Sequence, residues 1–227
     1  MQQRLISFDL DGTLVDTAGE IAEAANRTLR DFGLAPRPVS SFTPLIGHGH
    51  EVFIARLREE HPDALQRLPL NEMLERMNVH YTDTAGTMAP PYPDCAATLQ
   101  ALRDAGVVLA CITNKHHRFA QQVLDGCGLS PHFALVIGGD TLATRKPDAG
   151  PLCHALERLG VPAARAAHVG DASIDIQCAR AAGVAAWAVT WGYGSRDALT
   201  AAGAHRVFSS FKDIRSFARV DPSLATR

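Results

Sequence analysis

The 227-residue sequence has no apolar run close to the roughly 18 residues that a membrane-spanning helix needs, so we expect no membrane partner. It also lacks a surplus of basic residues: the net charge is −2, which gives no general attraction for nucleic acid. The N-terminal stretch does not show the basic, apolar and small-residue succession of a secretory signal. These absences favour a cytoplasmic protein in which any anionic ligand binds at a local site.

Cysteine is scarce, and its spacing shows no pairing. Five cysteines are scattered along the chain without a C-x-x-C pair, and Cys111 stands inside the apolar segment VVLACIT. An odd number at such spacing argues against a disulfide framework, and no Cys/His cluster has the spacing of a zinc site. We therefore expect buried, reduced thiols.

Strand-like and helical patterns alternate along most of the chain. The apolar run RLISF predicts a first strand at residues 4–8. From residue 95 onward four helical patterns each precede a further strand-like run. The predicted strands of this part cover residues 107–113, 134–139, 166–170 and 184–190. This alternation predicts an α/β fold with a parallel sheet and helices on both faces.

The segment between the first strand and this alternation is different, because its apolar residues recur at helical spacing only. Helices are predicted at 18–32, 50–61 and 70–83, and the Pro-rich stretch APPYPD follows. We predict that residues 16–88 form an all-helical domain inserted after the first strand. Residues 1–15 and 89–227 then form the α/β core.

Polar residues follow the predicted strands at their carboxyl ends, where ligands of open parallel sheets bind. We expect these residues to converge on one rim although they are far apart in the sequence. They are Asp9, Asp11, Gly12 and Thr13 after the first strand, then Thr113 and Asn114, then Arg145 and Lys146, and finally Asp171 and Asp175.

The carboxylates of this rim point to a metal site. Asp9 and Asp11 are two residues apart at the end of an extended strand, so their side chains can face one pocket. Gly12 permits a sharp turn and close approach of the backbone to a ligand. Asp171 and Asp175 can share a face across a strand-to-helix turn. Because crowded carboxylates need a cation and hard oxygen ligands suit Mg²⁺, we predict Mg²⁺ at these four acids.

The same residues supply every kind of group that phosphoryl transfer requires. One carboxylate can attack phosphorus and form an aspartyl-phosphate, and a second can protonate the leaving oxygen and later deprotonate water. Lys146 and the groups at Thr113 and Asn114 would stabilise charge on the transferred oxygens. Backbone N–H groups of the DLDG turn, residues 9–12, can form a nest for an anion.

Four short motifs, DLDGT, ITN, RKP and VGDASID, occur in this order along the chain. Together they resemble the four motifs of the haloacid dehalogenase superfamily, and the resemblance covers nearly the whole chain. It implies a Rossmann-like core, a helical cap domain and Mg²⁺. It implies Asp9 as the nucleophile and Asp11 as the general acid/base. By the same resemblance, Thr113 and Lys146 bind the phosphoryl group and Asp171 is a metal ligand.

By this resemblance, Asp175 is a metal ligand or supports one.

Within the superfamily, three segments are similar to those of phosphoglycolate phosphatases: LIGHGHEVFIARL, RKPDAGPLCHALERLGV and TWGYGS. This implies hydrolysis of a small phosphorylated metabolite, first of all 2-phosphoglycolate to glycolate and phosphate, by a monomer or homodimer. Ala172 stands where many relatives have Ser or Thr, which removes a hydroxyl but no ligand. Six residues are assigned to substrate binding: Leu10, Gly12, Thr13, Gly47, His48 and Asn114.

Other functions stay open on the sequence. The substrate can be a sugar or amino-sugar phosphate, or the protein can be a β-phosphoglucomutase-like sugar phosphomutase with His48 or His50 as its base. Dehalogenation is disfavoured by Asp11, because a departing halide needs no proton. A binding protein without activity would not require this set of acids and lysine.

Overall fold

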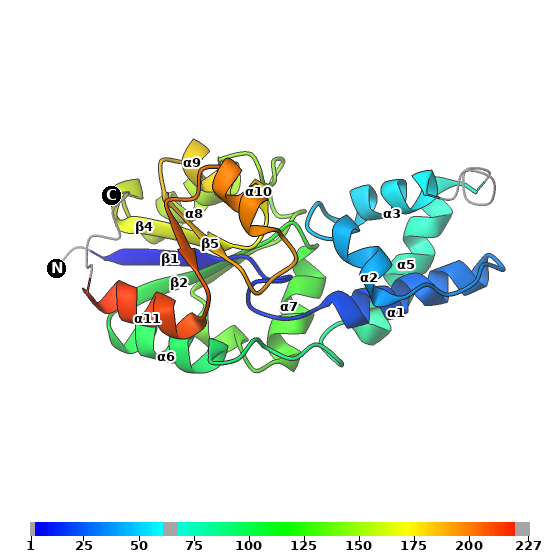
Figure 1. The fold of residues 1–227 in the computed structure, drawn as a ribbon, viewed down its shortest axis with the longest axis horizontal. Coiled ribbons are helices and arrows are strands. Elements are labelled where there is room, and N and C mark those ends of the chain that lie inside the picture. Colours follow the sequence, from blue (N-terminus) through cyan, green and yellow to red (C-terminus); the bar gives the residue numbers. More distant parts are fainter. Residues whose placement is uncertain (1–2, 61–67, 221–227) are drawn as a thin grey trace.

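The computed structural model describes residues 3–60 and 68–220. Within these ranges six parallel strands form one sheet in the order β3-β2-β1-β4-β5-β6 (Figure 1). The strands are β1 (Arg4–Phe8), β2 (Val107–Ile112), β3 (Leu135–Ile137), β4 (Ala166–Gly170), β5 (Ala185–Val189) and β6 (Arg206–Phe208). The five predicted strands and the α/β, Rossmann-like fold class are confirmed.

Strand β6 was not predicted from the sequence. It is only three residues long and half-buried at two of them, so it lacks the apolar run that marks the central strands. Its place in the sheet comes from pairing with β5, where Trp187 lies opposite Arg206. Tertiary pairing, rather than local pattern, makes this segment a strand.

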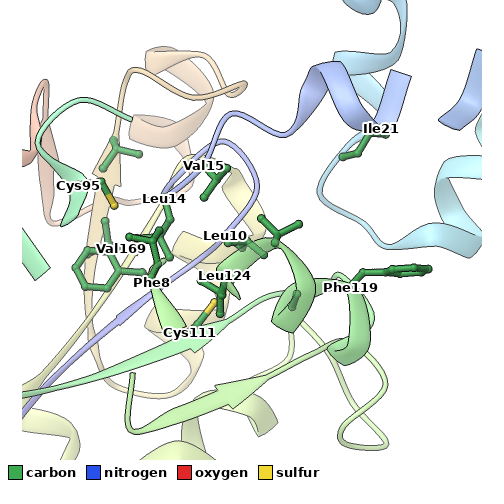
Figure 2. Close-up of a cluster of buried hydrophobic side chains, with 14 of the residues drawn as sticks. Phe8, Leu10, Leu14, Val15, Ile21, Cys95, Cys111, Phe119, Leu124 and Val169 are labelled. Atoms are coloured by element: carbon green, nitrogen blue, oxygen red, sulfur yellow. The ribbon is translucent and has the colours of Figure 1, made fainter. Parts of the chain in front are cut away.

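The sheet separates two hydrophobic cores because successive side chains of a strand point to opposite faces. Ile6 and Phe8 of β1 belong to the larger core, whereas Leu5 belongs to the smaller one. Figure 2 shows part of the larger core, in which Phe8, Cys111 and Val169 come from three adjacent strands. Strands β2, β4 and β5 are buried on both faces, as expected of a parallel sheet covered by helices.

Helices cover both faces of the sheet (Figure 1). They are α6 (Cys95–Asp104), α7 (His117–Gly126), α8 (Gly150–Leu159), α9 (Ser173–Ala181), α10 (Arg196–Ala201) and α11 (Phe211–Val220). Short 3₁₀ turns are η1 (Thr43–Leu45), η2 (Ser130–His132) and η3 (Ala163–Arg165). Helix α11 packs on α6, and α10 packs on α9.

A second group of helices lies beyond the carboxyl ends of the strands (Figure 1). It comprises α1 (Ala18–Asp31), α2 (Val39–Phe42), α3 (His50–Glu59) and α5 (Leu70–Thr84). Helices α1 and α5 pack together through buried side chains such as Leu29 and Met77. This helical group stands between β1 and α6 in the chain, where the sequence predicted it.

The division into a core (1–15 and 89–227) and an inserted helical domain (16–88) stays a prediction. Residues 1–2, 61–67 and 221–227 of these two predicted domains lie outside the described residues. In the part of the chain that is described, no helix combines the length and apolar character needed to cross a membrane.

Candidate active site

Asp9 and Lys146 meet at the carboxyl end of the sheet. The backbone N–H of Asp9 donates to the carbonyl of Val169 on β4 (2.9 Å), which places its side chain between two strands. Lys146 Nζ lies 2.8 Å from Asp9 Oδ1 and 2.7 Å from Asp175 Oδ1, and it donates to the carbonyl of Ile112 (2.8 Å). A buried ammonium thus joins two predicted site acids that are 166 residues apart in sequence.

Asp171 follows β4 and is held by two donors. Thr13 Oγ1 donates to its Oδ1 (2.8 Å), and the backbone N–H of Tyr193 donates to its Oδ2 (2.7 Å). Gly12 lies against the same carboxylate: a Cβ there would stand 2.4 Å from Asp171 Oδ2, and its φ is +77°. Any other residue at this position would displace Asp171 and strain the turn.

Asp175 is fully buried in the first turn of α9. Its Oδ2 accepts from the backbone N–H of Ala172 (3.0 Å), so the carboxylate also closes the helix N-terminus. His168 Nε2 approaches its Oδ1 at 3.4 Å, and Ser7 Oγ lies 2.9 Å from His168 Nδ1. These contacts fix the orientation of the carboxylate that faces Lys146.

Asp9, Asp171 and Asp175 form a group whose carboxylate oxygens lie within 4.8 Å of one another. Burial, reinforced by the neighbouring acids and only partly offset by Lys146, raises the pKa of Asp9 to about 8. Burial, together with Asp175, raises the pKa of Asp171 to about 7. Burial also opposes ionisation of Asp175, but Lys146 and His168 lower its pKa to about 2.

These pKa values show that one lysine does not neutralise the three buried acids. Ionisation of Asp9 and Asp171 at neutral pH costs free energy in the metal-free protein, and a divalent cation would remove this cost. The donors are carboxylate oxygens, the hard ligands that Mg²⁺ prefers. The residues present therefore fit the predicted cofactor, with Asp9, Asp171 and Asp175 as the side chains that would hold it.

We predict that Asp9 and Asp171 make the metal-free protein less stable at pH 8 than at pH 5. The pKa values of Asp9 and Asp171 are raised from the usual 3.8, so their contribution to stability is complete below pH 3.8 and is lost as the pH rises through about 7 and 8. The expected loss is on the order of a few kcal/mol, and saturating Mg²⁺ reverses it at pH 8.

Urea unfolding at both pH values, with EDTA or Mg²⁺, measures this difference. The lowered pKa of Asp175 acts only between about pH 2 and 3.8, outside the tested range. Burial lowers the pKa of His50 and of four other histidines below 6.5, which makes the protein more stable as the pH rises from 5 to 6.5. The difference between Mg²⁺ and EDTA at each pH therefore isolates the effect of the acids. A stabilisation by Mg²⁺ that is no larger at pH 8 than at pH 5 would contradict the prediction.

Asp11 lies outside this carboxylate group. Its Oδ1 accepts from Thr17 Oγ1 (2.6 Å) and lies 2.8 Å from Lys115 Nζ. The carboxylate therefore faces the entry to α1 and the chain after β2. Its predicted part in metal binding stays a prediction, and its position beside the carboxylate group fits the predicted role in proton transfer.

Thr113 and Asn114 lie at the end of β2, as predicted, and both are buried. Asn114 Nδ2 donates to the carbonyls of Lys146 (2.9 Å) and Gly47 (3.1 Å), so it ties the loop that carries the lysine to the helical group. Thr113 Oγ1 accepts from the backbone N–H of Lys115 (3.2 Å). Both side chains shape the loop that surrounds Asp9 and Lys146.

The remaining substrate-binding assignments lie in different surroundings. Gly47 lines two pockets, one containing Asp9 and Asp171 and the other containing Lys115. His48 is half-buried and lines neither of them, whereas His50 lines the second. Leu10 is fully buried in the larger core, so only its backbone is available to a ligand.

Five residues around the site were missed from the sequence: Glu20, Tyr81, Lys115, His168 and Tyr193. Lys115 directly follows the Thr-Asn pair after β2, and this position was the available signal. Tyr193 stands in the TWGYGS segment, whereas Glu20, Tyr81 and His168 come from segments with no motif of their own. Tyr193 binds Asp171 through its backbone and Asp16 through its hydroxyl (3.0 Å).

The fold and the site together define an α/β enzyme with a lysine-bridged group of acids at the strand ends and a helical group facing it. The family model of haloacid dehalogenase-like hydrolases matches residues 3–183, and the chain belongs to this family. The predicted superfamily membership is thereby confirmed.

Curated relatives and a solved structure agree with this family. The chain is 38% identical over 207 residues to the plasmid phosphoglycolate phosphatase of Cupriavidus necator, covering 91% of this chain and 89% of the relative. It is 40% identical over 189 residues to a phosphoglycolate phosphatase of Agrobacterium fabrum, covering 83% and 81%. The crystal structure of a predicted phosphoglycolate phosphatase from Haemophilus somnus matches with a TM-score of 0.89 at 28% identity, covering 96% and 99% of the chains.

Proposed function

We propose that this protein is a Mg²⁺-dependent phosphatase that hydrolyses 2-phosphoglycolate to glycolate and phosphate through an aspartyl-phosphate on Asp9. The observation that carries the proposal is the contact of Lys146 with both Asp9 and Asp175, next to Asp171 and Asp11. The substrate is inferred from the relatives, which are phosphoglycolate phosphatases and align over most of the chain.

In the first step, a carboxylate oxygen of Asp9 attacks phosphorus while the bond from phosphorus to the ester oxygen breaks. Asp11 gives its proton to that oxygen, so glycolate leaves as an alcohol. Lys146 balances charge on Asp9 and on the phosphoryl oxygens. Mg²⁺ bound by the carboxylate group would neutralise further negative charge on these oxygens.

In the second step, Asp11 accepts a proton from water as the water oxygen attacks the phosphorus of the aspartyl-phosphate. The bond from Asp9 to phosphorus breaks, phosphate leaves and the carboxylate is restored. Asp11 serves both steps because it lines the pocket that also contains Asp9 and Asp171. The helical group beyond the strand ends would limit access of water until the alcohol has left.

A phosphate-release screen tests this proposal. We expect 2-phosphoglycolate to have the highest kcat/KM among 2-phosphoglycolate, sugar phosphates, amino-sugar phosphates and nucleotides. EDTA should abolish phosphate release, and Mg²⁺ should restore it. Hydrolysis that persists unchanged in EDTA would contradict the metal requirement. Isomerisation of glucose 1-phosphate without phosphate release would show a phosphomutase instead.

A further inference from the structure

A pocket beside Asp11 is placed to receive the part of the substrate that leaves. It lies between the helical group and the carboxyl ends of the strands. Its lining residues include Asp11, Ile21, Leu45, His50, Phe53 and Lys115. Asp11 also lines the pocket that contains Asp9 and Asp171. If Asp11 protonates the ester oxygen, as in the proposed function on which this inference rests, the leaving group extends toward Lys115.

Lys115 carries the positive charge of this pocket. Among its lining residues, the other titratable base is His50, and burial, together with Lys115 and His116, lowers the pKa of His50 to about 3. His50 is therefore neutral at physiological pH. Much of the remaining wall is apolar, with Ile21, Leu45 and Phe53 among its members. A ligand in this pocket meets one ammonium in a largely apolar surrounding.

The Lys115 ammonium is held in place from two sides. Its Nζ lies 2.8 Å from Asp11 Oδ1, donates to the Tyr81 hydroxyl and stands 4.6 Å from the centre of the Tyr81 ring. The Tyr81 hydroxyl donates its hydrogen bond to Glu20 Oε1 (2.9 Å), which leaves an oxygen lone pair to accept from the lysine. An ammonium has three N–H bonds, so one remains for a ligand beyond these two described partners.

We propose that Lys115 determines specificity by binding a carboxylate of the leaving group. Asp11 contacts both this ammonium and, in the mechanism above, the ester oxygen, so the carboxylate and the ester oxygen must lie close together in the substrate. The phosphate ester of a 2-hydroxy acid meets this condition, since one carbon separates its carboxylate carbon from the oxygen. Losing a charge-assisted contact at a buried site costs about 1.5–3 kcal/mol, or roughly 10- to 150-fold in kcat/KM.

The test compares two esters of nearly equal size, 2-phosphoglycolate and 2-hydroxyethyl phosphate, which has a neutral CH₂OH in place of the carboxylate. For the wild-type protein we expect kcat/KM to favour 2-phosphoglycolate by about 100-fold. In Lys115→Met this ratio should fall to within about 3-fold. Any effect of the substitution on Asp11 is common to both esters and cancels in the ratio.

Tyr81→Phe is the matched control, because it removes the hydroxyl that accepts from the ammonium and keeps the ring and the lysine charge. We expect it to retain a preference of at least about 30-fold for 2-phosphoglycolate. Circular dichroism and the thermal midpoint show whether each variant folds. If Lys115→Met does not fold, the test is the ratio of the two kcat/KM values of the wild-type protein. Equal values for the two esters contradict a carboxylate-binding ammonium.

The outcomes separate this inference from the proposed function. Phosphate release from both esters at equal kcat/KM, or an unchanged ratio in Lys115→Met, overturns the role of Lys115 and leaves the phosphatase intact. Release from neither ester by the wild-type protein overturns the proposed function and the inference together. A collapsed ratio in Lys115→Met beside a retained ratio in Tyr81→Phe supports the inference.

Discussion

Replacing Asp9 by Asn is expected to lower kcat for phosphate release by at least about 10⁴-fold, because an amide cannot form the aspartyl-phosphate. The substitution keeps the shape of the side chain and removes a buried charge. Since burial and neighbouring acids raise the pKa of Asp9 to about 8, the loss of this charge relieves repulsion in the metal-free protein. We therefore expect the thermal midpoint without Mg²⁺ to stay equal or to rise at pH 8.

Steady-state phosphate release and thermal unfolding measure the two parts of this prediction. Asp104→Asn is a suitable control, because this exposed carboxylate of α6 accepts only from Gln100 among its described partners (2.7 Å). The control should retain wild-type activity. Residual activity of Asp9→Asn above about 1% of wild type would contradict nucleophilic catalysis by Asp9.

Replacing Lys146 by Met is expected to abolish activity and also to destabilise the fold. Lys146 Nζ contacts Asp9 and Asp175 at 2.8 and 2.7 Å, and its removal leaves these buried carboxylates without their cation. Removing one partner of a buried ion pair costs about 3–5 kcal/mol. The destabilisation should be larger at pH 8 than at pH 5, because protonated carboxylates no longer need the lysine.

Urea unfolding at both pH values measures the loss, and the control is Lys212→Met. Lys212 pairs with Asp94 at 3.3 Å on the surface, so its removal should change stability by less than about 1 kcal/mol. If Lys146→Met is too unstable to assay, the double variant Lys146→Met/Asp175→Asn removes both members of the pair. We expect it to regain part of the stability and to remain inactive; a stable, active Lys146→Met would contradict the role of the lysine.

The central strands could be predicted because their own sequence is sufficient. Apart from Arg4 and His168, RLISF and AAHVG consist of apolar or small residues, and both strands are buried on both faces of the sheet. Strand β6 could not be predicted in this way, because RVF is short and only partly buried. Its strand conformation depends on pairing with β5, and the sequence of residues 206–208 alone does not indicate that pairing.

The candidate site, like the fold, could be predicted only in part from the sequence. Asp9, Asp171 and Lys146 could be expected together, because the carboxyl ends of parallel strands meet at one rim. The sequence did not show that the Asp11 carboxylate turns away from this group toward Lys115, or that Tyr81 stands behind that lysine. Tyr81 belongs to α5, and the packing of α5 on α1 brings it there.

The sequence by itself determined the fold class, the family motifs and the acids at the strand ends, because each of these follows from local periodicity and from the order of strands along the chain. Only the tertiary structure decided how the charges are shared: Lys146 between Asp9 and Asp175, Thr13 and Tyr193 on Asp171, and Lys115 beside Asp11. The physical reason is that burial and pairing depend on distances between segments far apart in sequence. Those distances exist only after the strands have assembled into the sheet and, for Tyr81 and Lys115, after the helical group has packed against the strand ends.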